Sequence, residues 1–317
     1  MFHGDVSLEI AKGLQTLRKR IAISGIPASK LDETLNIATW NVREFGKTSR
    51  SEAAIHYIAE IVGQFDLVGL VELREDLSDL KKVMAILGPY WDAVYSDSIP
   101  DAGGNHERIC YLFDSRVVRF NGMACEASPP RKKTGTEYLA QLSWWRAPYV
   151  ATFKSGNYDF LAFTTHARWG DSEEARRVEL QGIADWVKAK SEEKHAEDKD
   201  ILVMGDFNIP SRKDPLFTAL TSGGLKLPKA LASDDFGSNL ARDKRYDQIL
   251  HMPRFVENFT NKGGVLDFYC NDHKALFPDL DKAAFTYQMS DHLPLWIQIN
   301  TDIDGMQLEQ IIQRKSP

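Results

Sequence analysis

The chain has few cysteines, no long apolar run and no excess of basic residues. Its three cysteines, Cys110, Cys125 and Cys270, form no Cys-x-x-Cys pair, and thiols this sparse suit a reducing compartment better than a disulfide framework. No run of about 20 apolar residues is present that could span a bilayer, and charged residues interrupt the N-terminus where a signal peptide needs an apolar core. We therefore expect a soluble, cytoplasmic protein.

Positive charge is not in excess either, since the formal net charge at pH 7 is -6. This balance excludes a generally basic coat for nucleic acid. A polyanionic substrate would have to be met by a local basic patch and by bound cations. Acidity alone does not exclude a nuclease.

Apolar residues are abundant, at 43% of 317 residues, so the chain can bury a large core. Three- and four-residue spacing of apolar residues predicts an amphipathic helix over 8–23. Strand signals dominate from residue 35 onward, which favours sheets packed face to face with helices outside. The expected strands are 35–42, 66–73, 91–96, 108–114, 117–122, 149–155, 158–166, 200–208, 246–252 and 293–299, and the other expected helices are 51–62, 77–87 and 172–193.

We expect three segments along the chain. A helical extension covers residues 1–34, one catalytic domain covers 35–300, and a short polar tail covers 301–317.

Polar side chains stand at the ends of several expected strands. Strand ends on one edge of a sheet can project into a shared cleft, while the apolar bodies of the strands hold them rigid. A single such residue is more often a turn former or a satisfied buried group, but several in one chain favour a site. They are Asn41, Glu72, His166, Asp206, Asn208, Asp291 and His292.

The order of seven motifs resembles the endonuclease/exonuclease/phosphatase superfamily over residues 35 to 300. The branch that the chain most resembles is that of deoxyribonuclease I, because Arg43 stands in the first motif and Glu72 and Arg74 form Glu-x-Arg. The motifs are NVREFG at 41–46, VELRED at 71–76, HERICYLF at 106–113, TTHARWGD at 164–171, MGDFN at 204–208, YDQIL at 246–250 and SDH at 290–292.

The resemblance implies a four-layer αββα sandwich with a cleft at one edge of two packed mixed sheets. It implies a divalent cation bound by Glu72, helped by Asn41, Asp206 and Asp291. It also implies that His166 and His292 flank a scissile phosphate, oriented by Glu107 and Asp247 respectively, and that Asn208 binds a phosphate oxygen or positions water. Arg43, Arg74, Arg146 and Arg168 are the expected substrate contacts.

Phosphodiester chemistry independently favours these residue types. Cleavage requires an in-line nucleophile, protonation of a departing alkoxide, and cancellation of charge on the non-bridging oxygens. Hard oxygen ligands such as Glu72 and Asp206 suit Mg²⁺, with Mn²⁺ or Ca²⁺ as alternatives, better than zinc. A carboxylate beside each histidine can divide acid and base roles between the pair. By analogy His292 is the base and His166 the acid, and the sequence leaves that choice open.

The substrate is less defined than the chemistry. A basic stretch at 129–138, followed by Trp144 and Trp145, could follow a sugar-phosphate backbone. The alternative is a solvated hairpin tip followed by strand aromatics in the core, and it is the favoured interpretation of the two tryptophans. Trp169 and Arg212 follow catalytic motifs and are further candidates for the cleft rim. Nonspecific cleavage of double-stranded DNA is expected, because backbone contacts do not read bases.

Two other functions stay open, namely a phosphatase for a small or lipid phosphate and a catalytically silent nucleic-acid-binding module. The lack of a signal peptide and of a disulfide argues against a digestive or extracellular role. An intracellular nuclease would need restraint, so we also expect a regulatory partner, a restricted substrate or low metal occupancy.

Overall fold

The computed structural model describes residues 1–170, 172–233, 236–254 and 256–315. Asp171, the last residue of the TTHARWGD motif, and residues 316–317 of the expected tail lie outside the described residues. No helix in the described ranges combines the length and the apolarity that a bilayer crossing needs.

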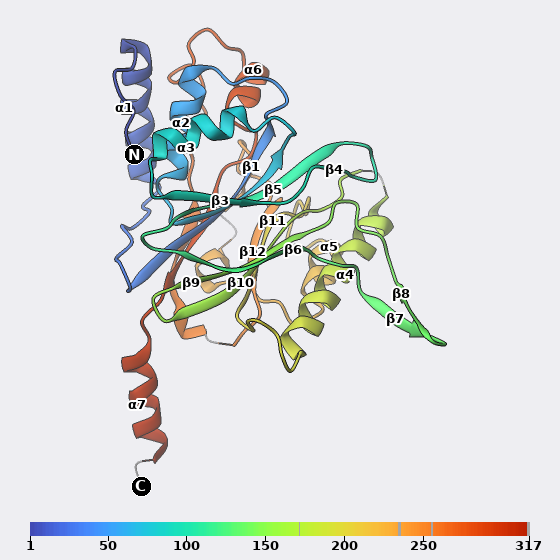
Figure 1. The fold of residues 1–317 in the computed structure, drawn as a ribbon. Coiled ribbons are helices and arrows are strands. Elements are labelled where there is room, and N and C mark those ends of the chain that lie inside the picture. The colour runs from blue at the N-terminus through green and yellow to red at the C-terminus, as the bar shows by residue number, and fades with distance from the viewer. Residues whose placement is uncertain (171, 234–235, 255, 316–317) are drawn as a thin grey trace.

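Two β-sheets form the centre of the molecule (Figure 1). Seven strands of the described chain make the first sheet, in the order β13-β14-β1-β2-β5-β3 with β4 paired to β5, and five make the second, in the order β12-β11-β10-β9-β6. The strands of the first sheet are β1 Thr34–Phe45, β2 Leu67–Leu73, β3 Trp91–Tyr95, β4 Ile99–Pro100, β5 His106–Asp114, β13 Phe259–Val265 and β14 Leu295–Asn300. Those of the second are β6 Arg119–Glu126, β9 Tyr149–Ser155, β10 Tyr158–His166, β11 Ile201–Asp206 and β12 Asp247–His251.

Helices cover the outer face of each sheet. Apolar residues of α1 and α2 share one core with the first sheet, while those of α4 and α5 pack on the second sheet. The helices are α1 Leu8–Ile23, α2 Glu52–Val62, α3 Ser78–Leu87, α4 Glu173–Glu192, α5 Pro215–Thr221, α6 Lys282–Gln288 and α7 Asp304–Lys315, with short 3-10 turns η1 Lys229–Leu231 and η2 Val256–Asn258. The expected αββα sandwich is therefore confirmed.

The central strands are buried on both faces because their sequences are almost continuously apolar. β1, β2, β10 and β11 contact one another across the interface between the sheets. Close approach depends on Gly69 in β2, where an added Cβ would lie 3.0 Å from Thr164 Oγ1 and 3.1 Å from Met204 Sδ. The Tyr111 hydroxyl, on β5, links the sheets by donating to the Tyr149 carbonyl oxygen at 2.8 Å.

Helix starts follow local capping chemistry. The side chains of Ser7, Ser51, Ser172, Asp214 and Asp281 each accept a hydrogen bond from a backbone N–H in the first turn of α1, α2, α4, α5 and α6. These caps explain why the expected helices begin within a residue or two of their observed starts.

Helix α1 is docked on the domain by a buried arginine. The Arg20 guanidinium donates to the carbonyl oxygens of Phe268 and Tyr269 at 2.8 and 3.0 Å, and Leu14 and Leu17 of the same helix are buried. The residues before 35 therefore add a packed helix to the outside of the first sheet.

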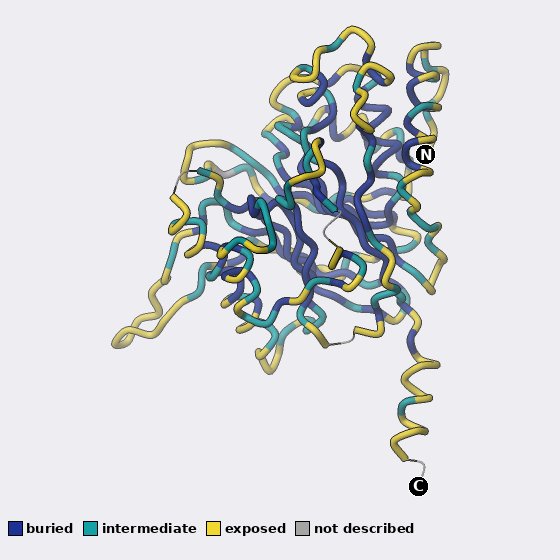
Figure 2. The backbone as a smooth tube through the Cα atoms, turned by 180° about the vertical axis from the view of Figure 1, so that it is seen from behind, coloured by how far each residue is buried: buried dark blue, intermediate teal, exposed yellow. Residues whose placement is uncertain are grey.

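Two elements extend away from this body (Figure 2). The hairpin of β7 Arg131–Thr134 and β8 Glu137–Ala140 is exposed along its whole length, so the basic stretch forms a solvated ribbon. α7, where the sequence predicted only a polar tail, has no buried residue in its described part.

Candidate active site

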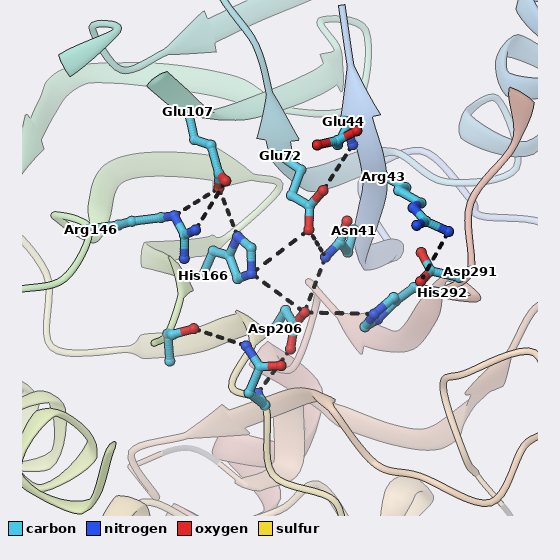
Figure 3. A network of polar contacts seen from close by, with 12 residues as sticks. Asn41, Arg43, Glu44, Glu72, Glu107, Arg146, His166, Asp206, Asp291 and His292 are labelled. Atoms are coloured by element: carbon cyan, nitrogen blue, oxygen red, sulfur yellow. Dashed lines mark hydrogen bonds and ion pairs between the residues drawn. The ribbon is translucent and has the colours of Figure 1, made fainter. Parts of the chain in front are cut away.

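Strand register brings the polar strand ends together. β10 and β11 are parallel, with His166 opposite Asp206, and β11 and β12 are antiparallel, with Asp206 opposite Asp247. β1 and β2 run parallel in the other sheet, with Asn41 opposite Val71, so Glu72 follows one residue later. One edge of the sandwich thus collects side chains from both sheets (Figure 3).

His166 forms a pair with Glu107. Its Nδ1 lies 2.8 Å from Glu107 Oε2, and the Arg146 Nε lies 2.9 Å from that same carboxylate oxygen. Burial raises the pKa of Glu107, but His166, Arg146 and Arg74 outweigh it and hold that pKa at about 2. Burial and Arg146 lower the pKa of His166, yet Glu107 and Asp206 give it a net rise. Glu107 is therefore an anion that fixes the ring with Nε2 facing the cleft.

His292 forms the matching pair with Asp247. The Nδ1 atom of His292 lies 2.7 Å from Asp247 Oδ2. Burial lowers the pKa of His292, but the carboxylates of Asp247 and Asp206 raise it to about 10. Because burial also raises the pKa of Asp247, the pair holds one proton tightly.

Serine hydroxyls hold both partners of the second pair in place. Ser290 Oγ accepts from the His292 backbone N–H at 3.0 Å and donates to the Asn41 carbonyl oxygen at 2.6 Å. Ser238 Oγ accepts from the Asp247 backbone N–H at 3.0 Å. The SDH turn is thereby tied to β1 of the first sheet.

Asp206 lies between the two histidines. Its Oδ2 is 3.8 Å from Nε2 of His166 and 3.8 Å from Nε2 of His292. Burial raises the Asp206 pKa, and the two imidazoles bring it below its ordinary value. Both Nε2 atoms therefore face one anionic oxygen, and Figure 3 shows the two imidazoles on either side of it.

Oxygen donors for a cation lie next to this position. Asn41 Nδ2 donates to Glu72 Oε1 at 2.8 Å and to Asp206 Oδ2 at 3.1 Å, while Asn41 Oδ1 is buried and has no hydrogen-bond partner among the described residues. Glu72 adopts a left-handed backbone conformation, with φ of 66°, and its Oε2 accepts from the Glu44 N–H at 2.8 Å. Two carboxylates and an unpartnered amide oxygen fit a hard divalent cation.

A second set of donors overlaps this one. Asp206, Asp247 and His292 each offer a ligand atom within 4.8 Å of the others. The hydrogen bond from His292 to Asp247 already uses one atom of each, so we favour the Glu72 side for a cation.

Asp291 lies at the rim of the cleft. Its carboxylate is 3.7 Å from the Arg43 guanidinium, and its side chain is 45% exposed. Figure 3 shows it beside His292, on the Arg43 side.

The expected substrate arginines are engaged to different degrees. Arg43 stacks on the Tyr287 ring at 4.0 Å, and Arg74 pairs with Glu44 at 3.2 Å. Arg146 pairs with Asp101 as well as Glu107. These side chains balance the acidic cluster and leave cationic groups at the cleft wall.

Arg168 differs from the other three arginines. Its guanidinium lies over the Trp145 ring at 4.4 Å, and the residues that line the cleft include Trp169 rather than Arg168.

The cleft has a volume of about 430 Å³ and contains both histidines. Asn208 lies in its wall with φ of 53°, and its Nδ2 donates to the Ala167 carbonyl oxygen at 2.9 Å. The lining residues are Asn41, Arg43, Glu44, Glu72, Arg74, Asn105, Glu107, Arg146, His166, Trp169, Asp206, Asn208, Tyr246, Tyr287, Asp291 and His292.

Several residues of the site were not singled out from the sequence. Glu44 and Tyr246 lie inside two of the motifs, NVREFG and YDQIL, where they could have been noticed. Asp101 lies in a loop and pairs with Arg146, and Tyr287 lies near the end of α6 and lines the cleft. Neither carries a sequence signal, and only the tertiary fold brings them there.

Fold and site together define an αββα sandwich with two histidine–carboxylate pairs and a cluster of oxygen donors at one edge. A profile of the Endonuclease/Exonuclease/phosphatase family matches residues 38–292, so the chain belongs to this family of phosphoester hydrolases. Deoxyribonuclease-1 of Bos taurus is 26% identical over 300 residues, which cover 91% of this chain and 99% of that protein.

Solved structures show the same fold at lower identity. The human Nocturnin catalytic domain with a bound sulfate anion superposes with a TM-score of 0.57 at 14% identity, covering 86% of this chain and 96% of that one. A mannosyl-6-phosphatase of Bacteroides thetaiotaomicron gives 0.53 at 17% identity, covering 84% and 99%. At these identities the similarity concerns the fold alone.

Proposed function

We propose that the protein is a Mg²⁺-dependent phosphodiesterase that nicks the DNA backbone without reading base sequence. The observation that carries the proposal is the position of Asp206 Oδ2, 3.8 Å from the Nε2 of each histidine. Two acid–base groups on opposite sides of one position suit in-line displacement at phosphorus, where one proton leaves the nucleophile and another reaches the leaving oxygen.

The four carboxyl side chains at the centre have distinct tasks. Glu107 and Asp247 orient His166 and His292 through Nδ1 and leave each Nε2 for proton transfer. Glu72 and Asp206, with Asn41, would hold the cation, which supplies charge cancellation on the non-bridging oxygens when bound.

We assign the base role to His292 and the acid role to His166. Without a bound cation, the carboxylates of Asp247 and Asp206 give His292 a pKa of about 10, so its ring is protonated. The base must be neutral, so the assignment requires that added positive charge near Asp206 lowers the His292 pKa.

Arg43, Arg74 and Arg146 line the same cleft and would receive the phosphates on either side of the scissile one. Such contacts bind a backbone without selecting a sequence. The similarity to a deoxyribonuclease over nearly the whole chain supports DNA as the polymer. The three cysteines are free thiols, which supports a cytoplasmic location.

The test compares substrate classes under one set of conditions. Supercoiled plasmid, a phosphomonoester panel and inositol phosphates are incubated with the protein and Mg²⁺ or Mn²⁺, with EDTA as control. The proposal expects metal-dependent nicking of the plasmid and slow turnover of monoesters. Faster turnover of a phosphomonoester would identify a phosphatase, and DNA binding without hydrolysis of any ester would identify a binding module.

A further inference from the structure

Trp169 is a large apolar side chain left in water at the mouth of the site. It follows His166 by three residues, lines the same cleft, and is 70% exposed. A tryptophan ring stabilises a fold mainly by being buried. Among the described residues, Trp169 belongs to neither hydrophobic core, so its exposed ring is available to a ligand.

The backbone before Trp169 is hydrogen-bonded to the end of β11 and to the residue that follows it by two. The Ala167 N–H donates to the Asp206 carbonyl oxygen at 2.8 Å, and Asn208 Nδ2 donates to the Ala167 carbonyl oxygen at 2.9 Å. Trp169 therefore starts from a segment whose position is set by the site itself.

A buried carboxylate on α4 fixes the next residue. Glu179 accepts from the Arg168 N–H through Oε2 and from the Trp145 N–H through Oε1, each at 3.1 Å. The Arg168 guanidinium also covers the Trp145 ring at 4.4 Å. Arg168 and Trp145 are thus in contact with each other. The indole of Trp169 is the exposed aromatic group at the rim of the cleft.

The chemistry around Trp169 indicates what would cover it. Arg146, His166 and Asn208, which share its cleft wall, are polar and suit a phosphate. A flat apolar ring beside them suits an uncharged planar group that is joined to that phosphate. In a nucleic acid this group is the base.

We infer that Trp169 is a stacking subsite for the nucleobase next to the scissile phosphate. A base inside an intact duplex has both faces covered by its neighbours, so only an unpaired, mismatched or terminal base offers a free face. The enzyme therefore cleaves single strands and distorted duplexes in preference to intact duplex. This inference rests on the proposed nuclease function and narrows its substrate class.

The test uses labelled oligonucleotides of one sequence in four forms. They are a single strand, an intact duplex, a duplex with one mismatch, and a single strand in which tetrahydrofuran residues replace the nucleotides around the cleavage position. The last form keeps the phosphodiesters and lacks the bases. The readout is the ratio of kcat/KM for the normal strand to that for the base-free strand.

Wild type should favour the normal strand by about 5- to 150-fold, the range expected for loss of one stacked base. Trp169→Ala should bring that ratio close to one, mainly through a higher KM, and Trp169→Phe should keep most of it. Tyr90→Ala is the matched control, because Tyr90 is an exposed aromatic, 54% exposed, beside Trp91, which pairs with the far end of β5. Its ratio should equal that of wild type.

Two results would overturn the inference, and the second would also overturn the proposed nuclease function. If wild type cleaves the strands but Trp169→Ala keeps the wild-type ratio, or intact duplex is cut as fast as a single strand, the stacking subsite is wrong and the nuclease stands. If wild type cleaves none of the strands and turns over a sugar phosphate instead, the nuclease proposal and the subsite both fail.

Discussion

The Nδ1 atom of His292 lies 2.7 Å from Oδ2 of Asp247; the Asp247 side chain is fully buried, and the His292 side chain is 12% exposed. One proton shared along this contact leaves Nε2 of His292 facing the cleft. The carboxylate is the main cause of the raised pKa of His292, after burial has opposed it.

Asp247→Asn should therefore lower the pKa of His292, because the amide carries no charge to stabilise the imidazolium. The shift should exceed about one unit, as expected for loss of an adjacent opposite charge. The pKa is measured from the pH titration of the His292 ring protons by NMR, without added metal. Asp243→Asn, at an exposed aspartate, should leave the titration where it is, and an unmoved His292 in Asp247→Asn would contradict the pairing.

Glu72→Gln should weaken the binding of the cation and slow DNA cleavage. The loss in rate should be about 10² to 10⁴, since the substitution removes a charged ligand beside Asp206. The concentration of Mg²⁺ that gives half of the maximal rate should also rise. Glu75→Gln is the control, because the Glu75 side chain is 68% exposed. An unchanged Mg²⁺ dependence in Glu72→Gln would remove Glu72 from the cation site.

Much of the fold could be predicted from the pattern of apolar residues in the sequence. The strands with continuous apolar sequence, such as β2 and β11, lie inside the two sheets rather than at their edges and are buried along most of their length. The short β7 and β8 strands were not predicted because every residue in them is exposed. β13 was missed because FTNKGGV has little apolar alternation and owes its strand structure to pairing with β14.

The motifs indicated more of the residues that line the cleft than of the contacts between those residues. The positions of Glu107 and Asp247 beside the two histidines agree with the expected pairing. No pattern in the sequence indicates that Arg146 spans Glu107 and Asp101, or that Arg168 stacks on Trp145. Such contacts join loop residues to other loops or to β5, so they depend on loop conformations that only the folded chain defines.

Asp66 should make the stability of the protein depend on pH. Burial is the main cause that raises its pKa to about 6, against hydrogen bonds from the Asn36 N–H and the Ser29 hydroxyl. A raised folded-state pKa contributes stability that is fully present below the ordinary value of 3.8 and is lost as the pH rises through about 6.

Asp66→Asn removes this titration, so wild type should lose about 2 kcal/mol relative to the variant between pH 4 and pH 7. The free energies of unfolding are measured in urea across that range. Asp92→Asn, at an exposed strand position, serves as control. A constant difference between wild type and Asp66→Asn at all pH values would show that Asp66 titrates normally.

Arg20→Met should destabilise the fold by about 2 kcal/mol or more, because the carbonyl groups of Phe268 and Tyr269 would lose a charged donor while buried. Urea unfolding measures the change. Lys19→Met, at the neighbouring exposed position, should leave stability nearly unchanged. Equal stability of the two variants would mean that α1 packs without help from Arg20.

The most direct test of the account is the rate at which His166→Ala nicks supercoiled plasmid in Mg²⁺. His195→Ala is measured beside it, since His195 is exposed and does not line the cleft. The account predicts that His166→Ala loses about 10² to 10⁴ in rate, that His195→Ala nicks at the wild-type rate, and that EDTA abolishes all nicking. Wild-type nicking by His166→Ala would contradict the paired-histidine site.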